Sequence, residues 1–600
     1  MTGRRMRKTV FVILIAVALV SVSGVAYLWV NSLVQSIYGY RTPLKGMPPL
    51  TESGTPPLTS QVVLVVIDGL RYDTSFEMPY LNYLRQQGAH ARLVSSPPSG
   101  AQIAWTALVS GAQPEINDAS LFDQSYQWIR PIAVDHLFAA LDRAGFTSGI
   151  VGFHWWEKLV PPELLHVKYY VATDDAAADA LVIDRAGAFL EEFHPNLLVV
   201  NLRHVNTAGQ EHGALSTEYE EAALRCDEHI RLLSASMDLQ RSVLVVVSSH
   251  GHLDQGGHGG AEAVTLDTPF VLVGESVRAG DHGLVAQTDV APTIAALLGA
   301  PIPSAAQGSI RTDLVTMDRV DKAYTLVALA DQRFRMANMY LYSIGEQAPG
   351  NSVESDVLVA RSSLQVRNYE SAHRLAKIAV DQITQNMAEM RDSRILKERY
   401  QRAAPVALVI LVPLWIMWRR RCWQLVWSAA AALVATSGYH ALYVHQGGVY
   451  SFSRVPAEGL AATLMLNLRH AGLSLVAGSL IMVWQLWRER ECSIRSAILR
   501  TYSHAGLQLY FVGLAVSACT LWNGSVFTWY IADLTLAYAH WTLLLQTMLV
   551  AALAIPLPIV VVALQKGLIF VSDRFERHRT HDGAPKGEPG NPRRQTCVSS

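Results

Sequence analysis

The sequence has little cysteine, little net charge and few charged side chains for its length. Five of its 600 residues are cysteines, and no two of them form a Cys-x-x-Cys pair, so neither a disulfide framework nor a zinc knuckle is expected. Basic and acidic side chains number 49 and 50, which leaves a net charge of -1. Because a protein that binds nucleic acid needs a basic excess to neutralise phosphates, this balance argues against nucleic acid as a partner.

Long apolar runs, in contrast, are abundant. Hydrophobic residues make up 50% of the chain and charged residues 16%, which is too apolar for one soluble domain. Residues 9–30 carry no charge and follow the basic segment 1–8, so we expect a transmembrane signal anchor there. A cleaved signal peptide is the alternative, although its apolar part would span only about 7 to 15 residues. Further apolar runs within 404–565 predict a membrane domain of about five helices, and so about six spans in all.

The distribution of Lys and Arg predicts the orientation of these spans. Basic residues cluster at 1–8, 419–421, 488–500 and 566–600. All four clusters fall on the same side if the N-terminus is cytoplasmic, as the positive-inside rule requires. We therefore expect an integral membrane protein with the bilayer as its partner, a disordered basic cytoplasmic tail at 566–600, and residues 31–403 outside the cytoplasm.

Polar residues interrupt two of the predicted spans. The run 404–418 is short and contains Pro413, so a kinked or interfacial helix is the alternative there. Another run contains Asn467 and Arg469, and a charge inside a membrane marks a functional site, here for a transporter or assembly component. We favour the alternative, a helix that begins near Ala471 and leaves both residues at the outer interface.

Residues 60–322 alternate short apolar runs with amphipathic segments. The runs lie at 62–67, 148–151, 197–202, 243–247 and 270–273. Runs rich in Val, Ile and Leu, separated by helical patterns such as 78–87 and 217–234, are typical of a buried, mainly parallel sheet. We therefore predict an α/β layered domain at 60–322, which a linker at 31–59 joins to the anchor.

Polar side chains follow several of these predicted strands. Asp68 comes directly after the first run, the turn 203–213 after the third, and the segment 248–252 after the fourth. In open parallel sheets, function collects at the carboxyl ends of the strands. An acid and several histidines at such ends indicate a metal site, since carboxylate and imidazole are the usual ligands of zinc, manganese or iron.

Three segments of this domain resemble the alkaline phosphatase superfamily. They are Val-Val-Ile-Asp68-Gly-Leu-Arg, Ser-Ser-His250-Gly-His-Leu-Asp-Gln-Gly-Gly-His258-Gly-Gly and Gln-Thr-Asp289-Val-Ala-Pro-Thr. The pattern is closest to the type I phosphodiesterase/nucleotide pyrophosphatase branch and is similar also to the GPI ethanolamine phosphate transferases. The resemblance covers roughly residues 60–310. It implies an alkaline-phosphatase-like domain with a two-metal site for phosphoryl transfer, in which both metals contact a Ser or Thr nucleophile.

Carried over residue by residue, the resemblance gives an incomplete site. The retained metal ligands are Asp68, His250 and His258. At four other positions the family's chemistry is lost: Ala101 stands at the nucleophile, Asn206 and Ser249 stand at two acids, and Gln210 stands at a histidine. The loss of two carboxylates strips two negative charges from a site that balances two divalent cations. Amide oxygens bind calcium but are poor zinc ligands, so we expect a weakly held divalent metal (zinc, manganese or calcium) or none.

These losses predict a catalytically degenerate, membrane-anchored phosphodiesterase-like protein. It would bind a phosphorylated ligand, a lipid or glycan, or a partner protein without turnover, because the methyl group of Ala101 cannot attack phosphorus.

The alternative is a rebuilt site with Ser99 as a substitute nucleophile in a shifted loop. The replacement ligands would be His204, His212, His252 and Asp254, together with His258. With these ligands around a single metal, metal-bound water could attack the phosphorus instead, without a protein nucleophile. The chain would in that case be an active metal-dependent phosphoric-ester hydrolase, or a phosphoethanolamine-type transferase on envelope lipid or glycan.

Residues 323–403 contain little Gly or Pro and favour helices. We predict one long helix over Ser362–Tyr400 that continues into the span at 404, with residues 323–343 as its antiparallel partner in a helical stalk. An extension of the α/β domain is the alternative.

Overall fold

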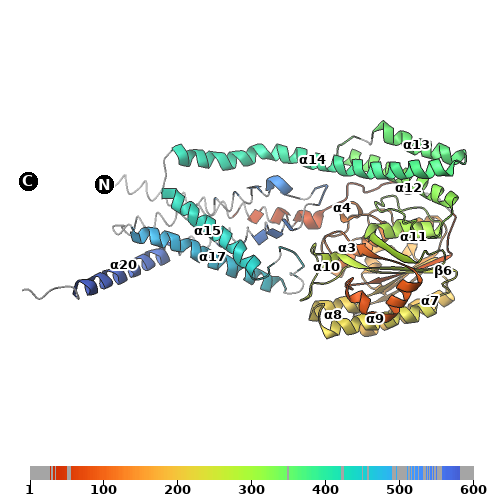
Figure 1. Cartoon of the computed structure of the whole chain (residues 1–600), viewed down its shortest axis with the longest axis horizontal. Coiled ribbons are helices and arrows are strands. Elements are labelled where there is room, and N and C mark those ends of the chain that lie inside the picture. The colour runs from red at the N-terminus through yellow and green to blue at the C-terminus, as the bar shows by residue number, and fades with distance from the viewer. Residues whose placement is uncertain are drawn as a thin grey trace, which may run out of the picture.

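The computed structural model describes residues 35–50, 56–347, 350–419, 424–448, 459–488 and 557–581, together with scattered positions among 24–33, 450–455 and 495–549. The α/β domain and a set of apolar helices lie at opposite ends of the long axis, and a helical stalk lies along the α/β domain and extends toward the apolar helices (Figure 1).

Eight strands form one mixed, mostly parallel sheet. The strands are β1 (Gln61–Ile67), β2 (Ala89–Val94), β3 (Ser148–Phe153), β4 (Val167–Val171), β5 (Leu197–Leu202), β6 (Ser242–Ser248), β7 (Asp267–Gly274) and β8 (Gly280–Ala286). Their order is β4-β3-β5-β1-β6-β7-β2-β8, and β7 alone runs antiparallel to its neighbours. The predicted α/β class is confirmed.

Helices cover both faces of this sheet, with α3 and α11 on one side and α7, α8 and α9 on the other (Figure 1). The helices of the domain are α2 (Pro79–Gln87), α3 (Ala101–Ser110), α4 (Pro114–Asn117), α5 (Leu137–Arg143), α6 (Trp156–Leu159), α7 (Ala176–Glu192), α8 (His204–His212), α9 (Thr217–Ala235), α10 (Ala263–Leu266) and α11 (Val290–Leu298).

The central strand β1 contributes side chains to two hydrophobic cores, one on each face of the sheet. Val62 and Val66 belong to the core that contains the apolar side chains of α3 and α11. Val63 and Val65 belong to the core that contains those of α7 and α9. Because successive residues of a strand point to opposite faces, burial on both faces requires β1 to be apolar throughout.

The five strands predicted from apolar runs are confirmed, but the prediction missed β2, β4 and β8. The sheet ends at β4 and β8, and both edge strands leave part of their residues exposed or half-buried. In β2, buried and half-buried residues alternate. None of the three is a continuous apolar run, which is the pattern that identifies a strand buried on both faces.

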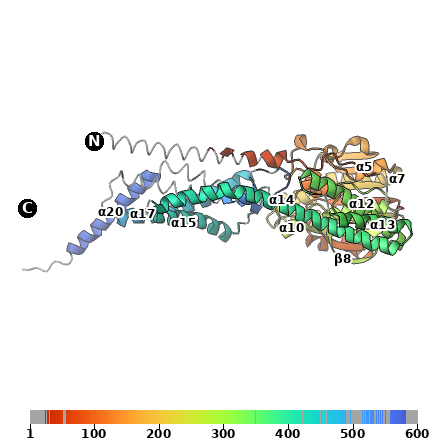
Figure 2. The ribbon, with the colours of Figure 1, turned by 90° about the horizontal axis from the view of Figure 1, so that it is seen from above.

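Three helices form the stalk: α12 (Arg319–Ser343), α13 (Asn351–Gln365) and α14 (Tyr369–Arg419). They share one apolar core with residues of the α/β domain such as Ile302 and Ala306, as the predicted extension of that domain would. α12 and α14, the two helices of the predicted pair, pack on each other within it. The long helix expected from Ser362 begins only at Tyr369, because the chain reverses after α13 through Arg367, whose φ is 61°. α14 then continues without a break through Pro413, so the run 404–418 is the end of the stalk helix. Figure 2 shows α14 extending from the α/β domain to the region of α15 and α17.

The remaining long helices are α15 (Gln424–His445), α17 (Leu460–Arg488) and α20 (Leu557–His581). Among the described residues, Leu460–Gln485 is the one helical segment long and apolar enough to cross a membrane. The expectation that this helix begins near Ala471 is wrong. Asn467 lies inside α17, where its buried amide donates to Thr463 O at 2.8 Å and accepts from the Tyr439 hydroxyl.

Several predicted segments lie outside the described residues. They are most of the anchor at 9–30, most of 489–556 and the tail beyond 581. The expected disorder of 566–600 is wrong for 566–581, which continue the apolar segment before them as the end of α20. The number of spans and their orientation therefore stay predictions.

Candidate functional site

The carboxyl ends of three adjacent strands bring the predicted site residues together. β1 lies between β5 and β6, and main-chain hydrogen bonds continue just past the strands, from Asp68 N to Leu202 O and from Ser249 N to Ile67 O. Asp68, the start of α8 and the loop after β6 therefore meet at one edge of the sheet, as predicted for a parallel arrangement.

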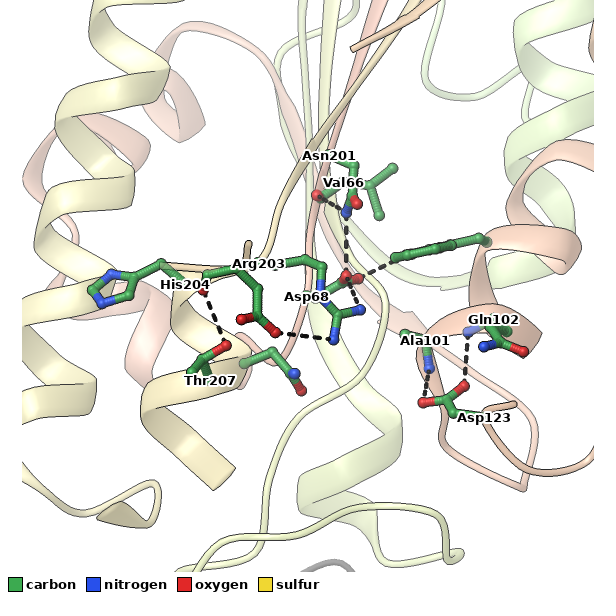
Figure 3. A network of polar contacts seen from close by, with 12 residues as sticks. Val66, Asp68, Ala101, Gln102, Asp123, Asn201, Arg203, His204 and Thr207 are labelled. Carbon is green, nitrogen blue, oxygen red and sulfur yellow. Dashed lines mark hydrogen bonds and ion pairs between the residues drawn. The ribbon is translucent and has the colours of Figure 1, made fainter. Parts of the chain in front are cut away.

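Asp68 is fully buried, and both oxygens of its carboxylate already have partners (Figure 3). Oδ1 accepts a hydrogen bond from Trp105 Nε1 at 2.7 Å. Oδ2 accepts from Asn201 Nδ2 at 3.2 Å and from Arg203 Nη1 at 3.3 Å. The carboxylate expected to bind a metal is thus enclosed by an indole, an amide and a guanidinium.

Arg203 supplies a positive charge where the family pattern implies a cation. Its guanidinium packs over the rings of Phe153 and Trp155, at 4.4 and 4.8 Å from their centroids. Cation–π contacts of this kind hold a desolvated guanidinium in place. Burial raises the pKa of Asp68, whereas the charge of Arg203 and, to a smaller extent, the nearby hydroxyl of Ser249 oppose that rise. The Asp68–Arg203 pair therefore needs no metal to compensate its charge.

Three histidines form a compact cluster beside this pair. The ring centroids of His250 and His258 lie 3.9 Å apart, and that of His252 lies 5.6 and 5.3 Å from them. All three side chains are buried. Burial is the main cause that lowers the pKa of each imidazole, so the three rings are neutral near pH 7.

The substituted positions Asn206 and Gln210 lie against two of these histidines. Asn206 Oδ1 lies 3.1 Å from His252 Nε2, and Gln210 Nε2 lies 3.2 Å from His258 Nε2. His258 Nδ1 lies 2.9 Å from Ser99 O, which can only accept, so the proton of the neutral ring sits on Nδ1. The lone pair on Nε2 then accepts from the Gln210 amide. These amides therefore engage Nε2 of His258, a retained ligand position, and Nε2 of His252, a possible replacement, whereas Nε2 of His250 has no partner among the described residues.

The N-terminus of α3 places Ala101 where the family pattern has its nucleophile. The carboxylate of Asp123 accepts hydrogen bonds from Gln102 N at 3.0 Å and Ala101 N at 3.3 Å (Figure 3). The free N–H groups of a helix N-terminus attract anions. In this protein an acidic side chain from the same chain takes that place.

Ser99, the predicted substitute nucleophile, lies beside the cluster but its hydroxyl is engaged. It is buried, donates to Gly260 O at 3.3 Å and accepts from Gly259 N at 2.9 Å. His258 contacts the carbonyl oxygen of Ser99 and not its hydroxyl.

The structure does not bring His212 or Asp254 into the cluster. His212 is about half exposed and lies 3.8 Å from Glu211, whereas Asp254 forms a 2.7 Å ion pair with Arg71. The main-chain N–H of His204 donates to Asp179 at 3.1 Å. Of the replacement ligands named from the sequence, only His252 lies with His250 and His258.

The residues present do not fit a two-metal centre. Within the described part of the chain, no group of three or more His, Cys, Asp or Glu side chains could hold a metal ion. The donor set explains why: Asp68 is ion-paired, two imidazoles face amides, and Ser249 provides only a hydroxyl at the position of an acid.

Four residues of this site were not predicted from the sequence: Trp105, Asp123, Asn201 and Arg203. Two of them have a sequence feature that could have identified them. Asn201 is the polar residue inside an apolar strand, and Arg203 directly follows the end of that strand. Trp105 and Asp123 have no such sequence feature, because they reach the site from the second turn of a helix and from a loop.

The comparisons with known proteins find the same family that the sequence motifs of the α/β domain resemble. Residues 62–270 match the family model described as type I phosphodiesterase / nucleotide pyrophosphatase. The chain is 27% identical over 279 residues to the human GPI ethanolamine phosphate transferase 2, catalytic subunit, a match that covers 42% of this chain and 28% of that protein. It is 27% identical over 290 residues to the mouse GPI ethanolamine phosphate transferase 3, catalytic subunit, covering 42% and 26%. The match thus spans under a third of either relative.

Among solved structures, murine ectonucleotide pyrophosphatase / phosphodiesterase 5 aligns with a TM-score of 0.36 and 14% identity, over 42% of this chain and 100% of that one. The alkaline phosphatase PafA aligns with a TM-score of 0.35 and 11% identity, over 43% of this chain and 99% of that one.

Proposed function

Because residues 62–270 form a domain of the alkaline phosphatase superfamily, in its type I phosphodiesterase / nucleotide pyrophosphatase branch, we propose that this chain is a membrane-attached member that has lost turnover. In this proposal the domain binds a phosphorylated ligand without cleaving it and holds it next to the membrane.

One observation carries the proposal: the Asp68 carboxylate is paired with Arg203 and hydrogen-bonded to Trp105 and Asn201. A metal would have to displace a guanidinium that is held by aromatic rings, and would leave that cation with Asp174 Oδ2, at 3.8 Å, as its remaining carboxylate partner. Removing one member of a buried ion pair costs about 3–5 kcal/mol. The site therefore favours its own side chains over a metal.

The nucleophile position supports the same proposal. Ala101 has no hydroxyl, and the Ser99 hydroxyl is engaged by the main chain of Gly259 and Gly260. The carboxylate of Asp123 at the start of α3 would also repel a phosphate there.

The apolar helix α17 supports attachment to a membrane, and the distribution of Lys and Arg supports an extracytoplasmic α/β domain with both chain ends in the cytoplasm. The loop after β6 lies close to the apolar helices, because Gly260 N donates to Ser453 Oγ at 2.7 Å and that hydroxyl donates to Glu262 Oε2 at 2.8 Å. A ligand in this region would lie near the lipid surface.

The second candidate is an active transferase or hydrolase with a rebuilt single-metal site. The observation that favours it is the buried Nε2 of His250, which has no hydrogen-bond partner within the described residues. The similar proteins are GPI ethanolamine phosphate transferases by name, so a phosphoethanolamine group on lipid or glycan would be the substrate.

Hydrolysis of bis(p-nitrophenyl) phosphate by the purified full-length chain separates the two candidates. We expect no hydrolysis above background with zinc, manganese or calcium, and no difference between the wild type and Asp68→Ala. Metal-dependent hydrolysis that Asp68→Ala abolishes would refute the proposed function and support the second candidate.

A further inference from the structure

A cavity of about 260 Å³ lies between the α/β domain and the stalk. Its polar lining comes from both parts: Gln113, Glu115 and Gln307 from the α/β domain, Arg333 and Tyr340 from α12, and Thr384 and Arg391 from α14. This cavity is separate from the cluster around Asp68 and contains none of its residues.

Arg333 is the feature of this cavity that packing does not explain. Its side chain is buried, and its Nη1 and Nη2 donate to Thr384 Oγ1 at 2.9 Å and Gly308 O at 2.8 Å. Its Nε has no hydrogen-bond partner, and among the described residues the one carboxylate that acts on Arg333 is Asp289, without an ion pair. A buried guanidinium without an anion is costly unless a partner arrives.

The other charges at the cavity cancel. Arg391 forms a 2.7 Å ion pair with Glu115, and the Tyr340 hydroxyl donates to the same carboxylate at 2.9 Å. Asp289 acts on Arg333 from a distance, but it does not line the cavity, and its oxygens accept from Ala286 N and Ser309 N. Arg333 therefore leaves the lining with a net positive charge.

We propose that this cavity binds a small phosphate-bearing anion through Arg333. The Nε–H of Arg333 has no partner, and Nη1 and Nη2 each carry a second N–H beside the one already engaged, so the guanidinium can still donate to phosphate oxygens. The volume admits a phosphate with a short organic group. The inference rests on the proposed function and names the place of its ligand, away from the strand ends where Asp123 already fills the anion position. A bound anion would contact both the α/β domain and the stalk.

Thermal unfolding of the full-length protein with added inorganic phosphate tests this site. The midpoint should rise with phosphate in the wild type, and equal ionic strength of chloride should not reproduce the rise. Arg333→Met should weaken phosphate binding at least tenfold. Arg361→Met is the matched control, because Arg361 lies on α13 of the same stalk and pairs with Asp331 at 2.7 Å, away from the cavity.

A second variant covers the case in which Arg333→Met does not fold. Gln307→Glu keeps the acceptor that Gln113 N uses and adds an anion to the lining, so it should raise the midpoint without phosphate and remove the response to phosphate. Equal responses in the wild type and Gln307→Glu, or none in the wild type, would overturn the site. Such a result would refute the phosphate site in the cavity and leave the proposed loss of turnover untouched. Hydrolysis that depends on Asp68 would refute the proposed function and leave the phosphate site untouched.

Discussion

The guanidinium of Arg203 lies 3.3 Å from the buried carboxylate of Asp68, and Trp105 donates to the other oxygen of the same carboxylate at 2.7 Å. A side chain of the protein thus provides the positive charge that the family pattern assigns to a metal ion. With a guanidinium in place of a metal ion, the carboxyl ends of the strands keep the arrangement of the family pattern but bind different ligands.

Replacement of Arg203 by Met should destabilise the α/β domain by about 3–5 kcal/mol, because it leaves the Asp68 carboxylate buried without its cation. Denaturant unfolding followed by tryptophan fluorescence measures the change. Arg225→Met is the control, since its pair with Glu221 is exposed and surface pairs contribute about 0–1 kcal/mol. Equal effects of the two substitutions would contradict the assigned role of Arg203.

Trp105→Phe removes one hydrogen bond from the buried carboxylate and keeps most of the ring packing against Trp156. We expect a loss of about 1–3 kcal/mol in the free energy of unfolding. Trp128→Phe serves for comparison, because the Trp128 side chain is 69% exposed. A neutral effect of Trp105→Phe would mean that the indole does not stabilise Asp68.

Restoring a hydroxyl at the nucleophile position should not restore activity. Ala101→Thr supplies the missing oxygen at the start of α3, but Arg203 still pairs with Asp68 and Asp123 still caps the helix. Hydrolysis of bis(p-nitrophenyl) phosphate should stay at background. If it rises, and falls again when Asp68→Ala is added, the loss of activity lies in Ala101 alone and not in the metal positions.

Asp179 should make the free energy of unfolding depend on pH. Burial raises the pKa of this carboxyl to about 7, although hydrogen bonds from Arg203 N and His204 N oppose the rise. The folded state therefore binds the proton more tightly than the unfolded state does. The stabilisation is complete below the unfolded pKa of about 4 and is lost as the pH rises through 7.

Asp179→Asn lacks this proton, so its stability relative to the wild type should increase between about pH 5 and pH 7 by up to about 1.4 kcal/mol per pH unit. Asp184→Asn, an exposed position on the same helix, is the control. Parallel pH profiles for the wild type and Asp179→Asn would refute the assignment.

The sequence predicted the parts of this fold that depend on local pattern. Apolar runs identified β1, β3, β5, β6 and β7, and the residues after them identified Asp68 and His250 at one edge of the sheet. Strands at the sheet edges were missed because their exposed residues break the pattern. The substitutions at Ala101 and Gln210 could be recognised from the sequence because the motifs fix their positions.

What replaces the metal could not be predicted from the motifs. Trp105 and Asp123 lie 37 and 21 residues in sequence from the groups they contact, and only the folded arrangement shows that they reach Asp68 and α3. The contact of Gln210 could not be predicted either. Its position was identified from the motif, but its contact with His258 depends on how α8 packs against the loop after β6.

Metal content of the purified full-length chain, measured by mass spectrometry after incubation with zinc, manganese or calcium and removal of free ions, decides whether the Asp68–Arg203 pair stands in place of a metal. We expect far less than one ion per chain, and the same value for Asp68→Ala. One or two ions per chain that are lost in Asp68→Ala would contradict it.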